Sequence, residues 1–136
     1  MYMKKIFCTL AVLAAVIVMS SCKTVQEIPT DLSSAQIIQL GQNAFSAGDY
    51  KNAERYYQTV IQRYGMDTAV YIEARYELGH LYVKTKNYEK AYAAFSEILE
   101  LYDYAMVGDL PSSYKKLAMI GMNKIPENKK PQKTEE

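Results

Sequence analysis

The fold is decided by residues 74–102, ARYELGHLYVKTKNYEKAYAAFSEILELY. Two helical patterns meet there, and Lys86-Asn87 separates them. The first pattern places small and apolar residues one helical turn apart, at Ala74, Leu78, Gly79 and Tyr82. The second pattern does the same with Tyr88, Ala91, Phe95, Ile98 and Tyr102. The stretch therefore predicts a hairpin of two helices, and no strand-like alternation competes with it.

The same hairpin pattern occurs 38 residues earlier. Seven positions match at this shift: Leu40-Gly41 with Leu78-Gly79, Tyr50 with Tyr88, Ala53 with Ala91, Tyr57 with Phe95, Val60 with Ile98 and Tyr64 with Tyr102. Here Gly48-Asp49 supplies the break, and Ile37 and Ala44 complete the first stripe. Helix starts are predicted at Ser33 or Ser34 and at Asp67 or Thr68. A fixed period of this size indicates stacked structural repeats.

These residues resemble the tetratricopeptide repeat, whose pattern is W-x2-L-G-x2-Y, then A-x3-F, then P. The first copy matches at Ile37-x2-Leu40-Gly41-x2-Ala44 with Ala53-x3-Tyr57, and the second at Arg75-x2-Leu78-Gly79-x2-Tyr82 with Ala91-x3-Phe95. The resemblance implies that the hairpins pack through Leu40, Gly41, Ala53, Tyr57, Leu78, Gly79, Ala91 and Phe95. We expect each glycine to face the alanine of its partner helix at close backbone approach.

The match departs from the family pattern in three respects. Ile37 and Arg75 stand in place of Trp, Gly65 and Asp103 stand in place of Pro, and the period is 38 residues instead of the usual 34. The four additional residues are expected in the turn and third helix together. The longer spacing resembles periplasmic members of the family, including the lipoprotein subunit of the outer-membrane β-barrel assembly machinery and the coiled-coil-linked repeat protein of cell-division sites.

The predicted fold is all-α, an α-α superhelix of two tetratricopeptide-like hairpins and one C-terminal capping helix. Its domain spans residues 31–125, with repeat 1 at about 34–67, repeat 2 at about 72–105 and the cap at about 112–124. The cap repeats the stripe at Leu117, Ile120, Gly121 and Lys124. Residues 126–136 are charged and lack apolar side chains, which predicts a disordered polar tail.

The amino terminus has the order of a secretory signal. Two lysines precede an apolar run, Ile6 to Met19, which is too short for a permanent membrane span. The run ends in Met19-Ser20-Ser21-Cys22, which resembles the bacterial lipobox, although the family usually has Leu where this chain has Met19. We expect residues 1–21 to be a lipoprotein signal peptide and residues 22–30 to be the lipidated Cys22 with a flexible linker. The alternative is an ordinary secretory cleavage site with Cys22 as a free thiol.

Cysteine usage favours the lipid anchor. Cys8 lies inside the signal, so Cys22 would be the single cysteine of the mature chain and would have no disulfide partner. Acylation of that sulfur accounts for its presence and would tether the domain to a membrane. The following residue is Lys23 and not the Asp that favours inner-membrane retention in enteric bacteria. We therefore expect a lipid-anchored protein of the bacterial cell envelope, on the outer membrane and facing the periplasm.

Composition and motifs argue against several functions. Once Lys4 and Lys5 are left out with the signal, 14 basic and 15 acidic residues remain, which gives no basis for nucleic-acid binding. His80 is the sole histidine, and no phosphate-binding glycine loop is present, so the sequence predicts no catalytic residues, no metal site and no cofactor. Glu97 and Glu100 are interpreted as members of a solvated helix face.

The resemblance implies a concave groove, lined by the first helix of each hairpin, as the binding site for a protein partner. Carried over position by position, its lining is Ile38, Gln42, Phe45, Tyr76, His80, Val83 and Met122. Ile38 and Gln42 stand where carboxylate-clamping members use Lys and Asn, which argues against that mode. The alternative is that Ile38, Phe45 and Tyr76 simply pack onto neighbouring helices.

The sequence thus predicts a membrane-tethered scaffold or adaptor module that binds a protein or peptide of the cell envelope. A second hypothesis is a structural lipoprotein that forms homo-oligomers through its incomplete repeat ends, because two repeats are fewer than the three that usually make a stable array.

Overall fold

The computed structural model describes residues 27–105 and 110–131. The expected signal peptide, Cys22, the start of the linker and residues 132–136 lie outside the described residues. Within them the chain forms helices and no strand, which confirms the predicted all-α class. The elements are α2 (Ser34–Ser46), α3 (Tyr50–Tyr64), α4 (Thr68–Lys84), α5 (Tyr88–Tyr104), α6 (Ser112–Asn123) and a 3-10 turn at Glu127–Lys129.

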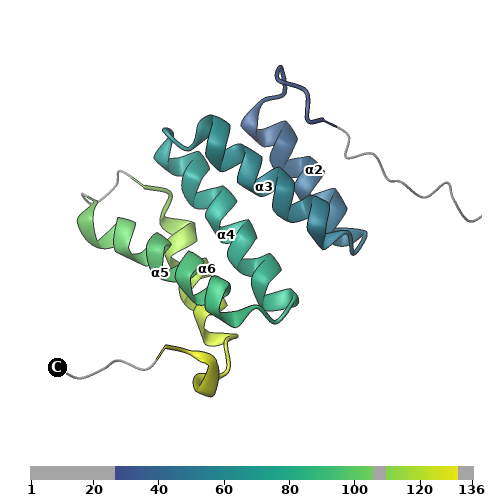
Figure 1. Ribbon diagram of the computed structural model, residues 1–136. Helices are drawn as coiled ribbons and strands as arrows, with labels where there is room; N and C mark the ends of the chain where they lie inside the picture. The colour runs from purple at the N-terminus through teal and green to yellow at the C-terminus, as the bar shows by residue number, and fades with distance from the viewer. Residues whose placement is uncertain (1–26, 106–109, 132–136) are drawn as a thin grey trace, which may run out of the picture.

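The helices pack as two hairpins and a cap, with α2 and α3 at one end of the molecule, α5 and α6 at the other, and α4 between them (Figure 1). Helix α2 pairs with α3, α4 pairs with α5, and α6 packs against both α5 and α4. Helix α4 lies in the middle and contacts all four other helices. Its buried residues therefore lie on several sides of the helix, at Ile72, Ala74, Leu78, Gly79, Leu81 and Tyr82.

The turns inside the two hairpins repeat the 38-residue period in the backbone. Gly48 and Lys86 occupy equivalent positions and both have positive φ, 77° and 61°. The following residues, Asp49 and Asn87, cap α3 and α5 by accepting hydrogen bonds from the backbone N–H groups three residues later. A left-handed residue followed by an Asx cap reverses the chain in both repeats, although only the first copy uses glycine there.

The additional turn of the longer repeat lies at the start of α4. This helix has 17 residues whereas α2 has 13. It begins at Thr68, four residues before the expected start of repeat 2 at residue 72, with Asp67 as its cap. Tyr71, in the added turn, donates a hydrogen bond to Glu97 of α5, and Arg75 donates to the same carboxylate from Nε at 2.7 Å. Glu97 is therefore part of the contact between α4 and α5, and the prediction of a solvated face does not hold for it.

The glycines of the repeat face aromatic rings. A Cβ added to Gly41 would overlap the ring of Tyr57, and one added to Gly79 would lie 2.6 Å from Cε1 of Phe95. Gly121 of α6 faces the same Phe95 ring from the cap. The expectation that each glycine faces the partner alanine is thus corrected: Ala53 and Ala91 are fully buried, but the first atoms that a new side chain would meet belong to the rings.

The other predicted packing residues lie in the core with one exception. Tyr57, Leu78 and Phe95 are at most 1% exposed, whereas Leu40 is half-buried. In the cap, the buried residues are Ala118 and Gly121, and the buried Ile125 follows the helix. The predicted stripe is therefore correct at Gly121 and wrong at Ile120 and Lys124, which are exposed.

The segment before α2 is attached to α3. Arg63, in the last turn of α3, donates hydrogen bonds to the carbonyl oxygens of Pro29 and Ile28 at 2.6 and 2.8 Å. Tyr64 donates to the carbonyl oxygen of Leu32. We call residues 28–32 the strap. The strap overlaps the end of the flexible linker that the sequence predicts, so the linker's last residues are fixed to the domain.

The carboxyl end of the described chain is also more ordered than the sequence predicts. Residues 126–131 belong to the expected disordered tail, yet they continue past the buried Ile125 into a 3-10 turn, Glu127–Lys129. Lys130 Nζ donates to Glu127 Oε2 at 2.7 Å and is only partly exposed. The apolar contact of Ile125 fixes the start of this segment.

Candidate interaction surface on helices α2, α4 and α6

A row of aromatic rings crosses the three helices that correspond to the first helix of each repeat and the cap. Phe45 of α2 lies against His80 of α4, with ring centroids 5.0 Å apart. His80 stacks on Tyr76, one turn earlier, at 6.3 Å. Tyr76 meets Tyr114 of α6 edge to face at 5.7 Å. Each of these four side chains is partly exposed, and we call them the ring row.

Three of the predicted groove residues, Phe45, Tyr76 and His80, are therefore brought together in this row. Gln42 lies on the same face, because its amide donates a hydrogen bond to Glu77 of α4 at 2.8 Å. Val83 and Met122 are partly buried against the main core cluster, and so are Phe45, Tyr76 and Tyr114. The alternative prediction, packing onto neighbouring helices, therefore holds for part of the surface of Phe45 and Tyr76.

Ile38 does not belong to this surface. It is 4% exposed and packs in a cluster with Ile37, Val60 and Ala74. The prediction that Ile38 lines the groove is therefore corrected in favour of the alternative, packing onto neighbouring helices.

Two glutamates give this face a negative end, and the sequence prediction missed both. Glu73 and Glu77 lie one turn apart on α4 and share the side of the helix that carries Tyr76 and His80. Glu77 Oε1 accepts the hydrogen bond from Gln42. The signal was present in the sequence, since residues 73, 76, 77, 80 and 83 recur at helical spacing. Tyr114 was also not predicted, since the resemblance placed only Met122 of the cap in the groove.

The hydroxyl of Tyr57 reaches the same region from behind. The ring of this fully buried residue passes over Gly41, and its Oη is buried. Burial raises the pKa of Tyr57, and the charge of Glu77 and a hydrogen bond with its carboxylate raise it further. The Tyr57 hydroxyl and the Glu77 carboxylate are thus close neighbours.

Burial and neighbouring charges shift the pKa values of three side chains on this face. Burial, followed by the carboxylates of Glu73 and Glu77, raises the pKa of Tyr114 to about 12. Burial and Glu77 also raise the pKa of Tyr76. At His80, burial lowers the pKa, Glu77 opposes this, and Lys124 and Lys84 lower it further. Burial and the two lysines thus favour the neutral form of the His80 ring.

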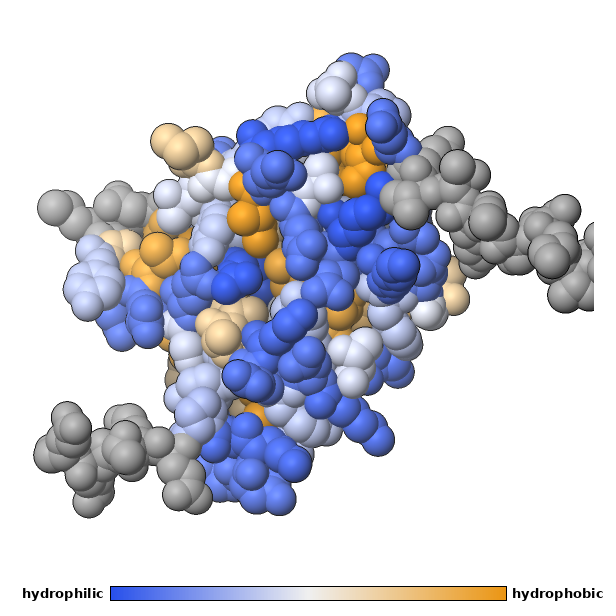
Figure 2. Space-filling model, in the orientation of Figure 1, coloured by the Kyte–Doolittle hydropathy of each residue, from blue (hydrophilic) through white to orange (hydrophobic). Residues whose placement is uncertain are grey.

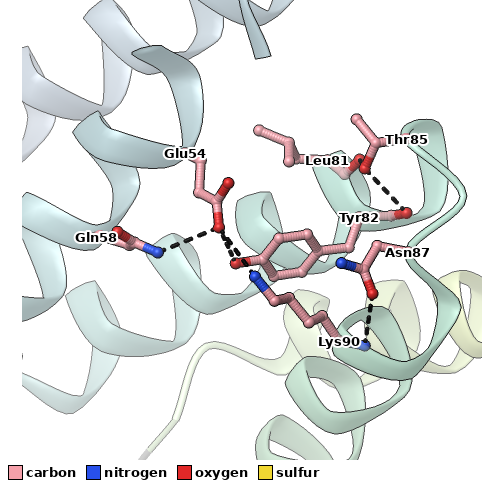
Figure 3. A network of polar contacts seen from close by, with 7 residues as sticks. All are labelled: Glu54, Gln58, Leu81, Tyr82, Thr85, Asn87 and Lys90. Atoms are coloured by element: carbon pink, nitrogen blue, oxygen red, sulfur yellow. Dashed lines mark hydrogen bonds and ion pairs between the residues drawn. The ribbon is translucent and has the colours of Figure 1, made fainter. Parts of the chain in front are cut away.

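A second polar cluster is centred on Glu54. Glu54 Oε1 accepts hydrogen bonds from Tyr82 at 2.6 Å and Gln58 at 3.3 Å, and Lys90 Nζ lies 3.6 Å away (Figure 3). The Lys90 ammonium also lies 5.1 Å from the centre of the Tyr82 ring. These contacts join α3, α4 and α5, and the polar groups pair with one another within the domain.

Figure 2 shows one face of the molecule on which hydrophilic residues predominate and hydrophobic residues form separate patches.

The described residues offer little for metal or membrane chemistry. Within 27–105 and 110–131, no three acidic, histidine or cysteine side chains are grouped so that they could hold a metal ion. No helix in the same ranges combines the length and the apolarity that crossing a membrane requires.

Comparison with known proteins supports the repeat assignment. Residues 44–103 match the family model described as tetratricopeptide repeat. Such repeats generally mediate protein–protein interactions and are typically not enzymes. The chain is also similar to a protein of Treponema pallidum (strain Nichols) described as an uncharacterized protein, with 32% identity over 100 residues. That alignment covers 74% of this chain and 40% of the relative, so the chain spans about two fifths of the relative's length. No solved structure matches.

Proposed function

We propose that this chain is a protein-interaction module of the bacterial cell envelope, tethered by lipid on Cys22 and presenting the face of α2, α4 and α6 to a partner protein. The observation that carries the proposal is the ring row, which runs without interruption from Phe45 through His80 and Tyr76 to Tyr114.

The chemistry of these side chains suits a protein partner. Aromatic residues supply large contact area at low entropic cost and are enriched at the centres of protein interfaces. Here the rings brace one another across three helices, so little freedom is left to lose when a partner binds. Polar groups flank them, with Gln42 and Glu77 on one side. A partly exposed aromatic surface with a polar border is the usual composition of a binding site.

The proposed location rests on the sequence before the described residues. Met19-Ser20-Ser21-Cys22 resembles the lipobox, and Lys23 favours the outer membrane, facing the periplasm. Because the strap fixes residues 28–32, about five residues between Cys22 and Ile28 are left to span the distance to the membrane, roughly 20 Å when extended. The proposed arrangement therefore holds the domain close to the lipid surface.

The double variant Phe45→Ala, Tyr76→Ala tests the binding face. Recovery of a partner from envelope extract, quantified by mass spectrometry, is expected to fall at least tenfold, because truncating two central interface aromatics commonly removes more than about 2 kcal/mol. The matched control is Met66→Ala, Tyr104→Ala, which removes apolar side chains that are 99% and 90% exposed elsewhere. Unchanged recovery with the folded double variant would exclude this face as the binding site.

A second candidate function is self-association through the cap. It is favoured by one observation, the exposure of Met119 and Ile120 on α6, at 54% and 44%. Light scattering on residues 23–136 should then show a mass that rises with concentration, and Met119→Lys, Ile120→Lys should return it to that of the monomer. A strict monomer at high concentration excludes the idea.

A further inference from the structure

The outer side of α6 combines exposed apolar side chains with lysines. Its exposed residues include Lys115, Lys116, Met119 and Ile120, followed one turn later by Lys124. Their spacing of three and four residues places them on one side of the helix. We propose that this side, which we call the basic face, is a contact site for a membrane surface of anionic phospholipids.

The basic face is separate from the ring row. The residues of α6 that pack towards α4 and α5 lie on the opposite side of the helix, where Ala118 and Gly121 are buried. Tyr114, which is the member of the ring row on α6, is partly buried against the main core cluster on that side. Contact through the basic face therefore does not use the ring row, and the two surfaces can be tested separately.

Charge is divided unequally between the cap and the hairpins. Residues 110–131 contain five lysines and one glutamate, a net charge of +4, whereas residues 27–105 contain seven basic and eleven acidic residues, a net charge of −4. Helix α6 has no acidic residue. It lies at the opposite end of the molecule from α2 (Figure 1). The domain is thus positive at the α6 end, which an anionic surface attracts.

The ion pairs of the cap leave most of this charge in place. Lys115 Nζ lies 3.6 Å from Asp103 Oδ1, and Lys130 Nζ lies 2.7 Å from Glu127 Oε2. In the first pair the side chains are 47% and 71% exposed, so the pair is weak. Even when Asp103 is counted with the cap, five lysines face two carboxylates, and the net charge is +3.

The composition of the basic face suits lipid better than a protein partner. Met119 and Ile120 are its exposed large apolar side chains, at 54% and 44%. Two such residues are far fewer than those needed to bury the roughly 800 Å² per partner of a stable protein interface. A membrane contact needs no such area, because lysines stay among the headgroups while the apolar side chains reach the acyl boundary.

The same charge disfavours a second copy as the occupant. Two chains that met through their basic faces would bring lysines against lysines, and like charges in contact oppose association. The lipid anchor proposed above would bring the domain to a membrane surface. The charge and exposure of α6 do not depend on that anchor, so the contact can be measured without it.

Vesicle binding by residues 23–136 tests the contact. This fragment contains every described residue and lacks Cys22, so its binding does not come from a lipid anchor. Sedimentation with vesicles of phosphatidylglycerol and phosphatidylcholine in equal parts should give a partition coefficient at least about tenfold higher than vesicles of phosphatidylcholine alone. High salt should reduce the difference. Equal binding to the two kinds of vesicle would overturn the proposal.

Lysine variants locate the binding on α6. Lys115→Gln, Lys116→Gln should lower the partition coefficient for the anionic vesicles about 25-fold, because each lysine near such a surface contributes about fivefold. Lys51→Gln, Lys86→Gln removes two exposed lysines from the hairpins and should lower it less than about twofold, since the attraction falls off within a Debye length. Circular dichroism melts check that both variants fold. Equal losses in the two variants would contradict a specific role of the basic face.

A fluorescent reporter identifies the occupant. Because the chain has no tryptophan, Met119→Trp places a single indole on the basic face. Its emission should shift to shorter wavelength when anionic vesicles are added, whereas the emission of Met66→Trp, at a position 99% exposed in the α3–α4 turn, should not change. A shift at Met119→Trp that follows protein concentration without vesicles would identify a second copy. A shift with polyglutamate but not with vesicles would identify an acidic protein, and either result overturns the lipid contact.

Discussion

Replacement of Phe95 by alanine is expected to lower the free energy of unfolding by about 3–5 kcal/mol. Phe95 is 1% exposed, and its ring fills the space between Gly79 of α4 and Gly121 of α6. Neither glycine has a side chain that could move into the cavity, so little relaxation is available. Small domains are stable by only about 5–15 kcal/mol, and much of that stability would be lost.

Urea denaturation followed by circular dichroism measures the effect on residues 23–136. Tyr104→Ala is the matched control, since Tyr104 belongs to the same helix and is 90% exposed; its effect should stay within about 0.5 kcal/mol. Phe95→Leu should fall between the two, because it leaves a smaller cavity. A Phe95→Ala variant with the stability of the Tyr104 control would contradict the central position of this ring.

The substitution Gly121→Ala should destabilise the protein by about 1–3 kcal/mol, against the usual direction of this change. In an exposed helix interior, replacing glycine by alanine stabilises by up to about 1 kcal/mol. Here the new Cβ would overlap the Phe95 ring, and the ring cannot retreat because Gly79 and its own helix confine it on the other side. The cost of overpacking therefore exceeds the gain in helix propensity.

Two measurements identify this cause. In the Phe95→Leu background, Gly121→Ala should cost less than in the unaltered protein, because a smaller side chain leaves room for the methyl group; the double-mutant cycle gives the coupling. Hydrogen exchange should also accelerate first in α6, which packs chiefly against α4 and α5. An additive cycle would show that the clash between Gly121 and Phe95 is not the reason.

Much of the fold is predictable because many residues of the repeat have strong local preferences for helix caps and turns. The breaks at Gly48-Asp49 and Lys86-Asn87 are the observed turns, and Ser33 and Asp67 are the observed caps. The partner of each glycine was not predictable in the same way. Spacing along a helix shows which residues share a side, but not how far a neighbouring ring extends across the contact.

The surface that carries the ring row was predicted only in part, because the family pattern does not describe every element that packs on α2. Ile37 and Ile38 are adjacent in sequence and lie on different sides of α2, yet both are buried. Ile28 and Leu32 of the strap pack against the cluster that contains Ile38, together with Val70 from the additional turn of α4. The family pattern includes neither element, so it could not indicate that this side of α2 is covered.

The hydrogen bonds from Arg63 and Tyr64 also determine which contacts bear the load when the chain before Ile28 is under tension. A pull on the chain before Ile28 meets three hydrogen bonds to the end of α3 before it reaches the first turn of α2. Without them, tension would open α2 from its free end, one backbone bond after another. With them, tension acts first on the hydrogen bonds from Arg63 and Tyr64 and reaches α2 only after these bonds have broken.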